Sequence, residues 1–293
     1  MSEWALARPV SRHLREHTSH RKGSSPARTL PFVTPQETVA PSPSPGERVG
    51  RGQASEAEKA RYVRRMFGAI APRYDLLNTL LSGGLHRRWK RFAAAQAHVP
   101  QGGRALDVCC GTGDLALLLA GRAGPRGNVV GVDIAEEMLR VARRKAHTAG
   151  LAGRVRFALG DAEALGLPDG AFDAATVAFG VRNTIHPQAA LLEIRRVLRP
   201  GGRLVVLEFS RPYNAAWGWL YSWYSFTLVP RVGRLVSRHA DAYLYLPTSI
   251  RAWPDQEGFA AMMIGAGFGE VRYHSLLGGV AAVHVGVRPA ALR

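Results

Sequence analysis

Cysteine is scarce in this chain of 293 residues, which contains only two. The two are adjacent, Cys109 and Cys110, and a disulfide between neighbouring residues is strained. Two cysteines also cannot form the paired CxxC signature of a zinc site. The count therefore excludes a disulfide framework, and we expect a reducing, cytoplasmic compartment and no metal.

Long hydrophobic runs and internal repeats are missing too. No apolar run approaches the roughly 18 residues that a membrane-spanning helix needs. The N-terminus lacks the apolar core of a signal peptide, and no self-similar period indicates a repeat architecture. The length allows one large α/β domain with a sizeable core.

Acidic residues are outnumbered, 22 against 39 lysines and arginines, which gives a formal net charge of +17. Such an excess suits nucleic acid, an anionic membrane surface or an acidic partner. The basic residues are dispersed, without a long Lys/Arg block, so solvated arginines explain the charge equally well. Composition alone leaves these alternatives open.

Residues 1–58 are rich in Pro, Ser, Arg and His and show no sustained apolar period. We expect this N-terminal extension to be disordered. It could be a transit peptide or an over-extended start, with Met66 as an alternative initiator. From Glu56 apolar residues follow helical spacing, which predicts two or three helices at the start of a domain over residues 59–293.

Strands and helices alternate in the main part of the chain. The strand-like runs are residues 104–109, 128–132, 154–158, 172–178 and 203–208. The helix-like runs between them are residues 114–123, 135–149 and 187–198. This order predicts a mainly parallel sheet with right-handed crossovers. Two further runs, 270–275 and 280–287, predict an antiparallel hairpin at the sheet edge, and residues 211–253 are expected to form a helical lid or substrate insertion after the fifth strand.

A glycine turn, Gly111-Thr112-Gly113, joins the first of these strands to a helix. Such a turn lets a ligand approach the backbone and the N–H groups at the helix start. The spacing also fits a GxGxxA dinucleotide motif. Asp107 and Asp114 flank the turn, however, and would repel a pyrophosphate. They favour a ligand with an ammonium and a sulfonium, which predicts S-adenosylmethionine (SAM).

Two more acids follow the next strands. Asp133 is placed to accept hydrogen bonds from ribose hydroxyls, and Asp161, followed by Ala162, could bind the adenine amino group. Each Asp alone could be a helix cap. Three at successive strand ends favour a ligand site, because open α/β sheets bind ligands at that edge. Cys109 and Cys110 are expected to pack behind this ligand rather than to react.

Several segments resemble the quinone-biosynthesis C-methyltransferases, over roughly residues 60–288. The matching strings are "YDLLNTLLSGGLHRRW" (74–89), "FGVRN" (179–183), "RVLRPGGRLVVLEFS" (196–210) and "SIRAWPDQ" (249–256). Leu77, Ala178 and Arg199 depart from the family pattern, where Met, Ser and Lys are usual. "CCGTGD" and "YHSLLGGVAAVHVG" (273–286) look more like the menaquinone-type members.

The resemblance implies a class I SAM-dependent methyltransferase, an α/β Rossmann-like fold with a seven-stranded sheet. It implies methyl transfer to a ring carbon of a polyprenylated quinol, and the menaquinone-like motifs favour demethylmenaquinol, with 2-methoxy-6-polyprenyl-1,4-benzoquinol as the alternative. Arg182 and Asn183 would stabilise a developing phenolate. Tyr74, Asp75, Asn78 and His86 would build the lid or quinone pocket. Glu208 has no assigned role, and His284 is expected in the core.

Other functions make different predictions. An RNA methyltransferase would usually carry Asn/Asp-Pro-Pro-aromatic, which the chain lacks, so we expect no nucleic acid partner. A scaffold would show no turnover, and the flanking acids disfavour a NAD-dependent reductase. Aromatic residues concentrated in 211–246 indicate peripheral contact with the inner face of a membrane. The resemblance also allows a homodimer.

Overall fold

One mixed β-sheet organises the fold in the computed structural model, which describes residues 7–8, 44–224, 227 and 240–290. Its strand order is β1-β7-β8-β6-β5-β2-β3-β4. The strands are β1 (Ala7–Arg8), β2 (Arg104–Val108), β3 (Asn128–Asp133), β4 (Val155–Leu159), β5 (Phe172–Ala178), β6 (Leu198–Phe209), β7 (Gly269–Leu276) and β8 (Ala281–Val287). The seven predicted strands are confirmed, and β1 adds a two-residue pairing beside β7.

The sheet is parallel from β4 through β3, β2 and β5 to β6. Strand β8 lies between β6 and β7 and is antiparallel to both. The predicted hairpin is therefore present, with its second strand inserted next to β6. The parallel strands bring their carboxyl ends to one edge of the sheet, where ligands of open α/β sheets bind.

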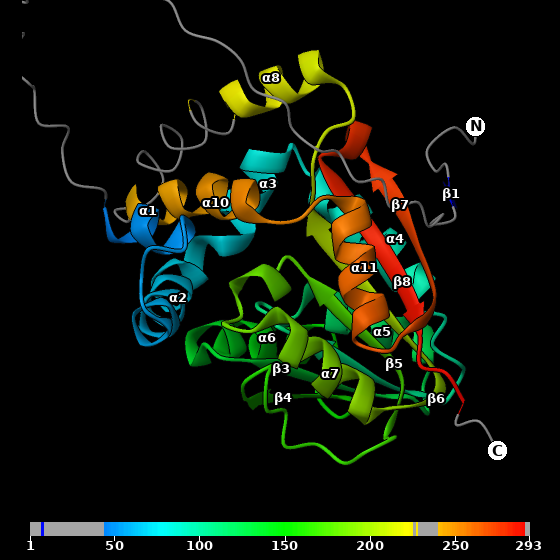
Figure 1. The fold of residues 1–293 in the computed structure, drawn as a ribbon. Coiled ribbons are helices and arrows are strands. Elements are labelled where there is room, and N and C mark those ends of the chain that lie inside the picture. The colour runs from blue at the N-terminus through cyan, green and yellow to red at the C-terminus, as the bar shows by residue number, and fades with distance from the viewer. Residues whose placement is uncertain (1–6, 9–43, 225–226, 228–239, 291–293) are drawn as a thin grey trace, which may run out of the picture.

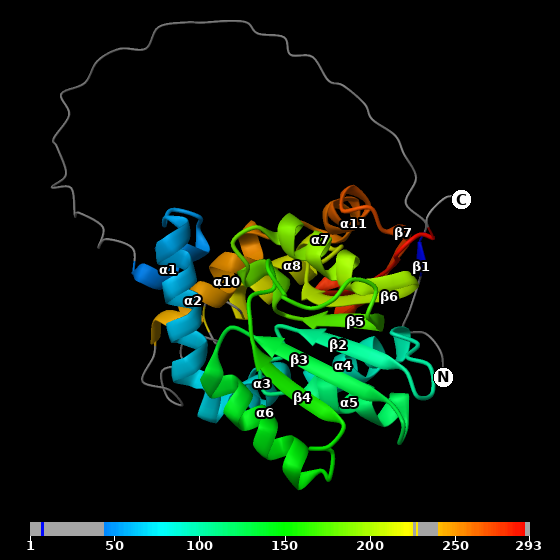
Figure 2. The same ribbon diagram turned by 90° about the horizontal axis from the view of Figure 1, so that it is seen from below.

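Helices cover both faces of the sheet (Figure 2). The helical segments are α1 (Pro45–Gly50), α2 (Glu56–Ile70), η1 (Ala71–Arg73), α3 (Tyr74–Ser82), α4 (Leu85–Gln96), α5 (Asp114–Ala123), α6 (Glu136–Thr148), η2 (Val181–Asn183), α7 (Pro187–Val197), α8 (Ala215–Trp223), α10 (Ala240–Ala252), α11 (Gln256–Gly265) and η4 (Leu277–Gly279). Residues of α4 and α5 pack on one face, and residues of α7 and α11 on the other. Successive side chains of β2 point to opposite faces of the sheet, so Ala105 packs with residues of α5 and Leu106 packs with residues of α7.

A separate helical group lies beside the sheet (Figure 1). Helix α1 packs against α10, and α2 contacts α6. Val49, Val63, Met66, Leu77 and Tyr245 form its buried core. The group thus combines the segment before the sheet with the insertion after β6.

The boundary of the N-terminal extension differs from the expectation. Disorder was expected up to residue 58, yet residues 45–50 form α1 and α2 begins at Glu56. Burial of Val49 against α10 holds α1 in place, and a capping box between Ser55 and Glu58 starts α2. The rest of the extension, residues 1–6 and 9–43, lies outside the described residues.

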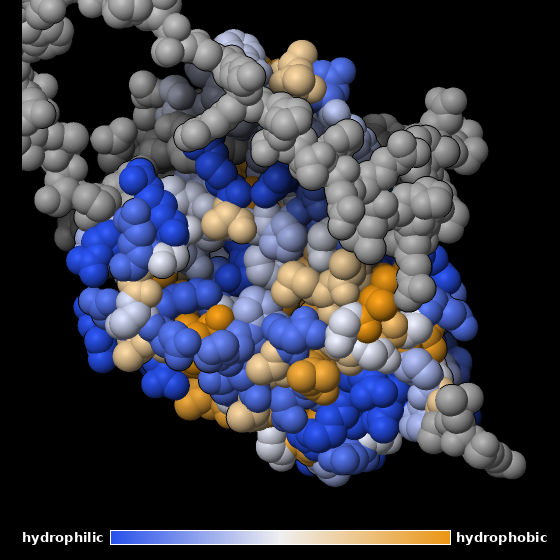
Figure 3. Space-filling view, in the orientation of Figure 1, coloured by the Kyte–Doolittle hydropathy of each residue, from blue (hydrophilic) through white to orange (hydrophobic). Residues whose placement is uncertain are grey.

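The predicted insertion, residues 211–253, is helical where it is described, as α8 and α10. No described helix is long and apolar enough to cross a membrane. Figure 3 shows a face on which hydrophilic and hydrophobic residues are interspersed, without one continuous apolar patch.

Candidate functional site

The glycine turn has the geometry predicted for it. Gly111 and Gly113 have φ of 53° and 81°, in the left-handed region that glycine adopts without strain. A Cβ on Gly113 would lie 2.9 Å from side-chain atoms of both Ala142 and Phe157. Helix α5 begins immediately afterwards, at Asp114. The turn therefore requires glycine and presents backbone N–H groups at a helix start.

Asp133 fastens this turn to the end of β3. Its carboxylate accepts hydrogen bonds from the backbone N–H groups of Gly111 and Ala135, at 2.8 and 2.9 Å. Burial raises the pKa of Asp133, although these bonds favour the charged form. A carboxylate oxygen can accept more than one bond, so Asp133 can also receive ribose hydroxyls.

A cleft opens at this edge of the sheet. Its wall includes four of the predicted cofactor-binding residues: Gly111, Asp133, Asp161 and Ala162. Cys109 also lines it, and burial raises the pKa of both cysteine thiols, which keeps them protonated and unreactive. The other three predicted cofactor residues, Asp107, Thr112 and Gly113, do not line it.

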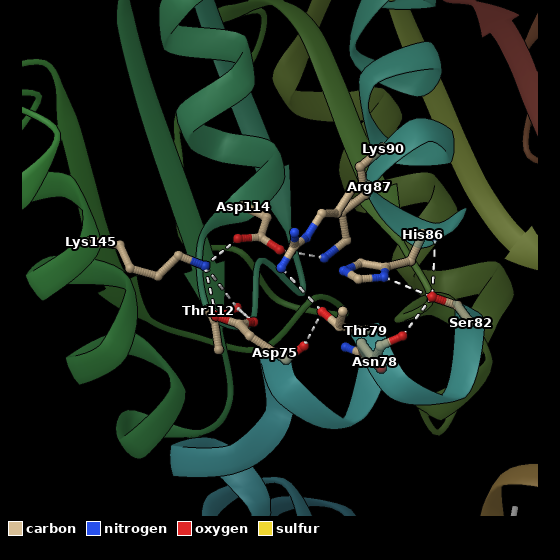
Figure 4. Close-up of polar contacts among 10 residues, drawn as sticks. All are labelled: Asp75, Asn78, Thr79, Ser82, His86, Arg87, Lys90, Thr112, Asp114 and Lys145. Atoms are coloured by element: carbon tan, nitrogen blue, oxygen red, sulfur yellow. Dashed lines mark hydrogen bonds and ion pairs between the residues drawn. The ribbon is translucent and has the colours of Figure 1, made fainter. Parts of the chain in front are cut away.

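A charged cluster occupies the back of the turn (Figure 4). Thr112 Oγ1 donates to Asp75 Oδ1 at 2.6 Å, which joins α3 to the turn. Lys145 pairs with Asp75 at 2.9 Å and also with Asp114, and Lys90 pairs with Asp114 at 2.9 Å. Partial burial would raise the pKa of Asp114, but the two ammonium groups outweigh it and lower the pKa to about 2.

This cluster corrects one step of the sequence argument. Asp114 was expected to repel a pyrophosphate, but its charge is neutralised by two lysines and it does not line the cleft. Asp75 was expected in the lid or quinone pocket, and instead it bonds to the cofactor turn. The lysines come from α4 and α6, so sequence spacing gave no sign of them.

Asp107 remains as the acidic group behind the turn. Thr176 Oγ1 donates to Asp107 Oδ1 at 2.7 Å, whereas Oδ2 is buried and has no partner among the described residues. Burial raises the pKa of Asp107 to about 7. An unsatisfied carboxylate oxygen beside a glycine cradle fits a ligand that carries an ammonium group, as SAM does.

A second, larger cavity of about 590 Å³ adjoins the cleft. Phe67, Tyr74 and Phe179 line both, so the two spaces meet at these three rings. Its walls come from α2, α3, α4, α8 and α10 and are mostly apolar. The few polar side chains on the wall include Asn78, His86, Lys90 and Arg182. The cavity therefore suits an apolar molecule with a small polar head.

Arg182 enters this cavity from η2, directly after β5. Its Nη1 lies 2.5 Å from Glu208 Oε1 and 2.9 Å from the Phe179 carbonyl. The two charged side chains are 5% and 1% exposed, and the guanidinium also lies over the Phe209 ring at 5.2 Å. Burial raises the pKa of Glu208, although Arg182 opposes this. The pair fixes a cation at the junction of the two spaces.

Asn183 is held by a residue from the insertion. Its Nδ2 donates to the Phe179 carbonyl at 3.1 Å, and Tyr245 donates its hydroxyl to Asn183 Oδ1 at 2.8 Å. Burial raises the pKa of Tyr245 to about 12, so this hydroxyl remains a donor. Sequence reasoning missed Tyr245, which is 62 residues away along the chain, and left Glu208 without a role.

Other predicted residues fall where expected. Tyr74, Asn78 and His86 line the large cavity. His284 is buried in the core, where its Nε2 contacts the Gln256 carbonyl at 2.8 Å. Across the described part of the chain, no group of three or more His, Cys, Asp or Glu residues could hold a metal ion.

Comparison with known proteins agrees with this geometry. Residues 54–288 match the family described as "ubiE/COQ5 methyltransferase family". A relative from Azotobacter vinelandii, "Ubiquinone/menaquinone biosynthesis C-methyltransferase UbiE", is 48% identical over 240 residues, which cover 82% of this chain and 95% of the relative. A protein of the same name from Ectopseudomonas mendocina is 47% identical over 245 residues, or 84% and 96% of the two chains.

Solved structures share the fold at low sequence identity. A SAM-dependent methyltransferase from Thermotoga maritima, described as a possible histamine N-methyltransferase, matches with a TM-score of 0.53 and 22% identity. The match covers 77% of this chain and 99% of that one. The cyclase SpnF matches with a TM-score of 0.53 and 21% identity, over 79% and 97% of the chains. These similarities establish the class I methyltransferase architecture.

The family match extends over the cofactor cleft, the Arg182–Glu208 pair and the larger cavity alike. The strand order, with an antiparallel last strand between two others, is that of the predicted Rossmann-like class. The chain therefore belongs to the ubiE/COQ5 methyltransferase family and is a SAM-dependent C-methyltransferase.

Proposed function

We propose that this protein methylates a ring carbon of demethylmenaquinol and so forms menaquinol. The observation that carries the proposal is the mostly apolar cavity of about 590 Å³, which meets the cofactor cleft beside a buried arginine. A polyprenylated quinol has a long apolar tail and a ring with two hydroxyls, which matches these walls. The relatives' names include both ubiquinone and menaquinone, and the turn and tail motifs favour the menaquinone branch.

The chemistry requires a nucleophilic ring carbon. SAM supplies an electrophilic methyl group when it is bound in the cleft. Loss of a hydroxyl proton from the quinol places negative charge on the oxygen and the adjacent carbon. The guanidinium of Arg182 can stabilise that charge, as buried cations do at developing oxyanions.

Asn183 and Glu208 contribute by position. Glu208 fixes Arg182 at the junction, and Asn183 is oriented by Tyr245 and by the Phe179 carbonyl. The junction itself is lined by three aromatic rings, Phe67 on α2, Tyr74 on α3 and Phe179 directly after β5. Holding the ring carbon in line with the methyl group at about 3–3.5 Å is the remaining requirement.

Peripheral membrane contact at the cytoplasmic face is part of this proposal. Trp219, Leu220 and Trp223 on α8 are 72%, 43% and 52% exposed, and Leu220 and Trp223 also line the cavity. Exposed aromatic residues suit a membrane interface, and here they lie at the wall of the cavity that would admit the lipid tail. Helix α8 stands out from the rest of the described molecule in Figure 1.

The test of activity uses labelled SAM with three acceptors: chemically reduced demethylmenaquinone, a 2-methoxy-6-polyprenyl-1,4-benzoquinol and tRNA. We expect label on the naphthoquinol, and loss of label in Arg182→Ala but not in the exposed control Arg199→Ala. Label only on the benzoquinol would move the protein to the ubiquinone pathway. Label only on tRNA would refute a quinone substrate, and SAM binding without any transfer would indicate a scaffold.

Membrane contact is tested separately, by sedimentation with phosphatidylglycerol vesicles. Replacing Trp219 and Trp223 by Ser should reduce the bound fraction. Leu192→Ser is the matched control, because Leu192 is 49% exposed on α7, away from the cavity. Equal binding of both variants would contradict a role for α8.

A further inference from the structure

The carboxylates of Asp133 and Asp161 line the cofactor cleft, but neither lines the larger cavity that would hold the quinol. The guanidinium of Arg182 has only hydrogen-bond donors, and Glu208 does not line the cavity. His86 on α4 lines the cavity and is only 4% exposed. It is therefore a titratable side chain, more than nine-tenths buried, at the wall of the substrate space.

Hydrogen bonds determine where His86 carries its proton. Ser82 Oγ lies 2.5 Å from the Asn78 carbonyl, a distance at which the hydroxyl proton must lie between the two oxygens. A hydroxyl has one proton and two lone pairs, so Ser82 Oγ can only accept at its other two contacts, from the His86 backbone N–H at 3.3 Å and from His86 Nδ1 at 2.8 Å. The neutral imidazole thus carries its proton on Nδ1, and Nε2 has a free lone pair.

Nothing in the described chain uses that lone pair. The only contacts of the ring nitrogens with polar groups are those of Nδ1 with Ser82. Figure 4 shows Nδ1 facing Ser82 and the other ring nitrogen facing away from it. Lys90, one turn further along α4, donates to Asp114 instead.

Helix α4 runs along the cavity wall towards the junction. Trp89 lies on the same face of the helix, three residues on, and its ring is 6.4 Å from that of Phe179. Phe179 lines both the cleft and the cavity, so it marks the junction. His86 is therefore about one helical turn, roughly 5 Å along the axis, from Trp89, whose ring lies beside Phe179 at the junction.

Surrounding charges keep His86 neutral. Burial lowers its pKa, and the cations Lys90 and Arg87 on the same helix act in the same direction. Asp114 on α5 and Asp75 on α3 oppose the shift without reversing it. The imidazole is accordingly available as an acceptor at neutral pH.

We propose that Nε2 of His86 accepts the hydroxyl proton of the quinol and is the general base of the reaction. The inference rests on the proposed function. The O–H bond breaks as its proton moves to Nε2, and its electron pair increases the density on the adjacent ring carbon. That carbon forms the new C–C bond with the methyl group while the methyl–sulfur bond breaks and leaves its pair on sulfur. The ring C–H proton then leaves to water, which restores the aromatic ring, and the imidazolium returns its proton to the ring oxygen, so the product is the quinol and one proton is released overall.

The test compares His86→Gln with wild type in single-turnover methylation of reduced demethylmenaquinone. Glutamine fills similar space but cannot take up the proton, so we expect about a 10²-fold fall in kcat. The SAM Kd, measured by calorimetry, should not change. Wild-type kcat should fall about tenfold per pH unit below the pKa of His86, and this acidic limb should be absent from the variant. His147→Gln, at an exposed site on α6, is the matched control and should behave as wild type.

Two further variants keep the proposal refutable if glutamine disturbs the fold. His86→Ala should regain activity when imidazole is added, in proportion to the unprotonated imidazole present. Ser82→Ala frees Nδ1 and should lower kcat severalfold. A His86→Gln enzyme with kcat within twofold of wild type, or with the acidic limb intact, would overturn the role of His86. Absence of wild-type turnover on any quinol would instead overturn the proposed function.

Discussion

Neutralising Glu208 should destabilise the protein strongly, because it would leave Arg182 as a buried charge without its partner. The two side chains are 1% and 5% exposed, so water cannot replace the lost interaction. Breaking a buried ion pair from one side typically costs about 3–5 kcal/mol. In Glu208→Gln the amide oxygen can still accept from Arg182 and from the Phe209 N–H, which favours the lower end of this range. A loss of about 3 kcal/mol corresponds to a Tm decrease of about 6–12 °C.

Thermal unfolding followed by circular dichroism measures this effect. The control is Glu136→Gln, because Glu136 pairs with Arg143 at the surface, and its Tm should equal that of wild type. The double variant Arg182→Met/Glu208→Leu should regain much of the lost stability while remaining inactive, since it removes both charges. If Glu208→Gln melts within about 2 °C of wild type, the charge of Glu208 is not needed to stabilise the buried Arg182.

Three further predictions concern the cofactor turn and the insertion. Asp114→Asn should lower the free energy of unfolding by about 2 kcal/mol above pH 4, because the pKa of Asp114 is about 2 in the folded protein against an ordinary 3.8. In urea titrations, this difference in stability between wild type and variant should disappear as the pH falls from about 4 to 2. Tyr245→Phe removes the hydrogen bond to Asn183, so it should lower the free energy of unfolding by about 1 kcal/mol and lower kcat without changing the SAM Kd. An unchanged kcat would contradict a role for Tyr245 in orienting Asn183. Gly113→Ala should lower the free energy of unfolding by about 1–3 kcal/mol, because the added methyl group has no room. It should also abolish the increase in Tm that SAM causes, which melting curves with and without SAM would measure.

Much of the fold could be predicted from the sequence because local signals agree with each other. The β2 run ends at a glycine turn, and the turn opens α5, so pattern and turn chemistry point to the same element. Helices also separate β2 from β3, β3 from β4 and β5 from β6, which leaves few alternative topologies. Helix α1 was not predicted, because six residues in a polar stretch do not form a stable helix alone. They become helical through packing against α10, which lies about 190 residues further along the chain.

The site was less predictable, since its side chains are positioned by contacts that sequence spacing does not show. Asp133 and Asp161 could be placed from their strand ends, and both line the cleft. Asp114 looked equally suited, but lysines from two other helices neutralise it. The roles of Glu208 and Tyr245 emerge only when β6 and α10 are seen against η2.

The position of β8 affects when the enzyme can become complete during synthesis. This strand is formed by residues 281–287, after every other strand in the sheet, yet it lies between β6 and β7 rather than at the edge. Until it emerges from the ribosome, β6 has an unpaired edge next to Glu208, and β7 has no neighbour on that side. A nascent chain without β8 would expose both edges to intermolecular pairing. Catalytic competence should therefore arise late, and stop codons before residue 281 should produce aggregation instead of a partly active enzyme.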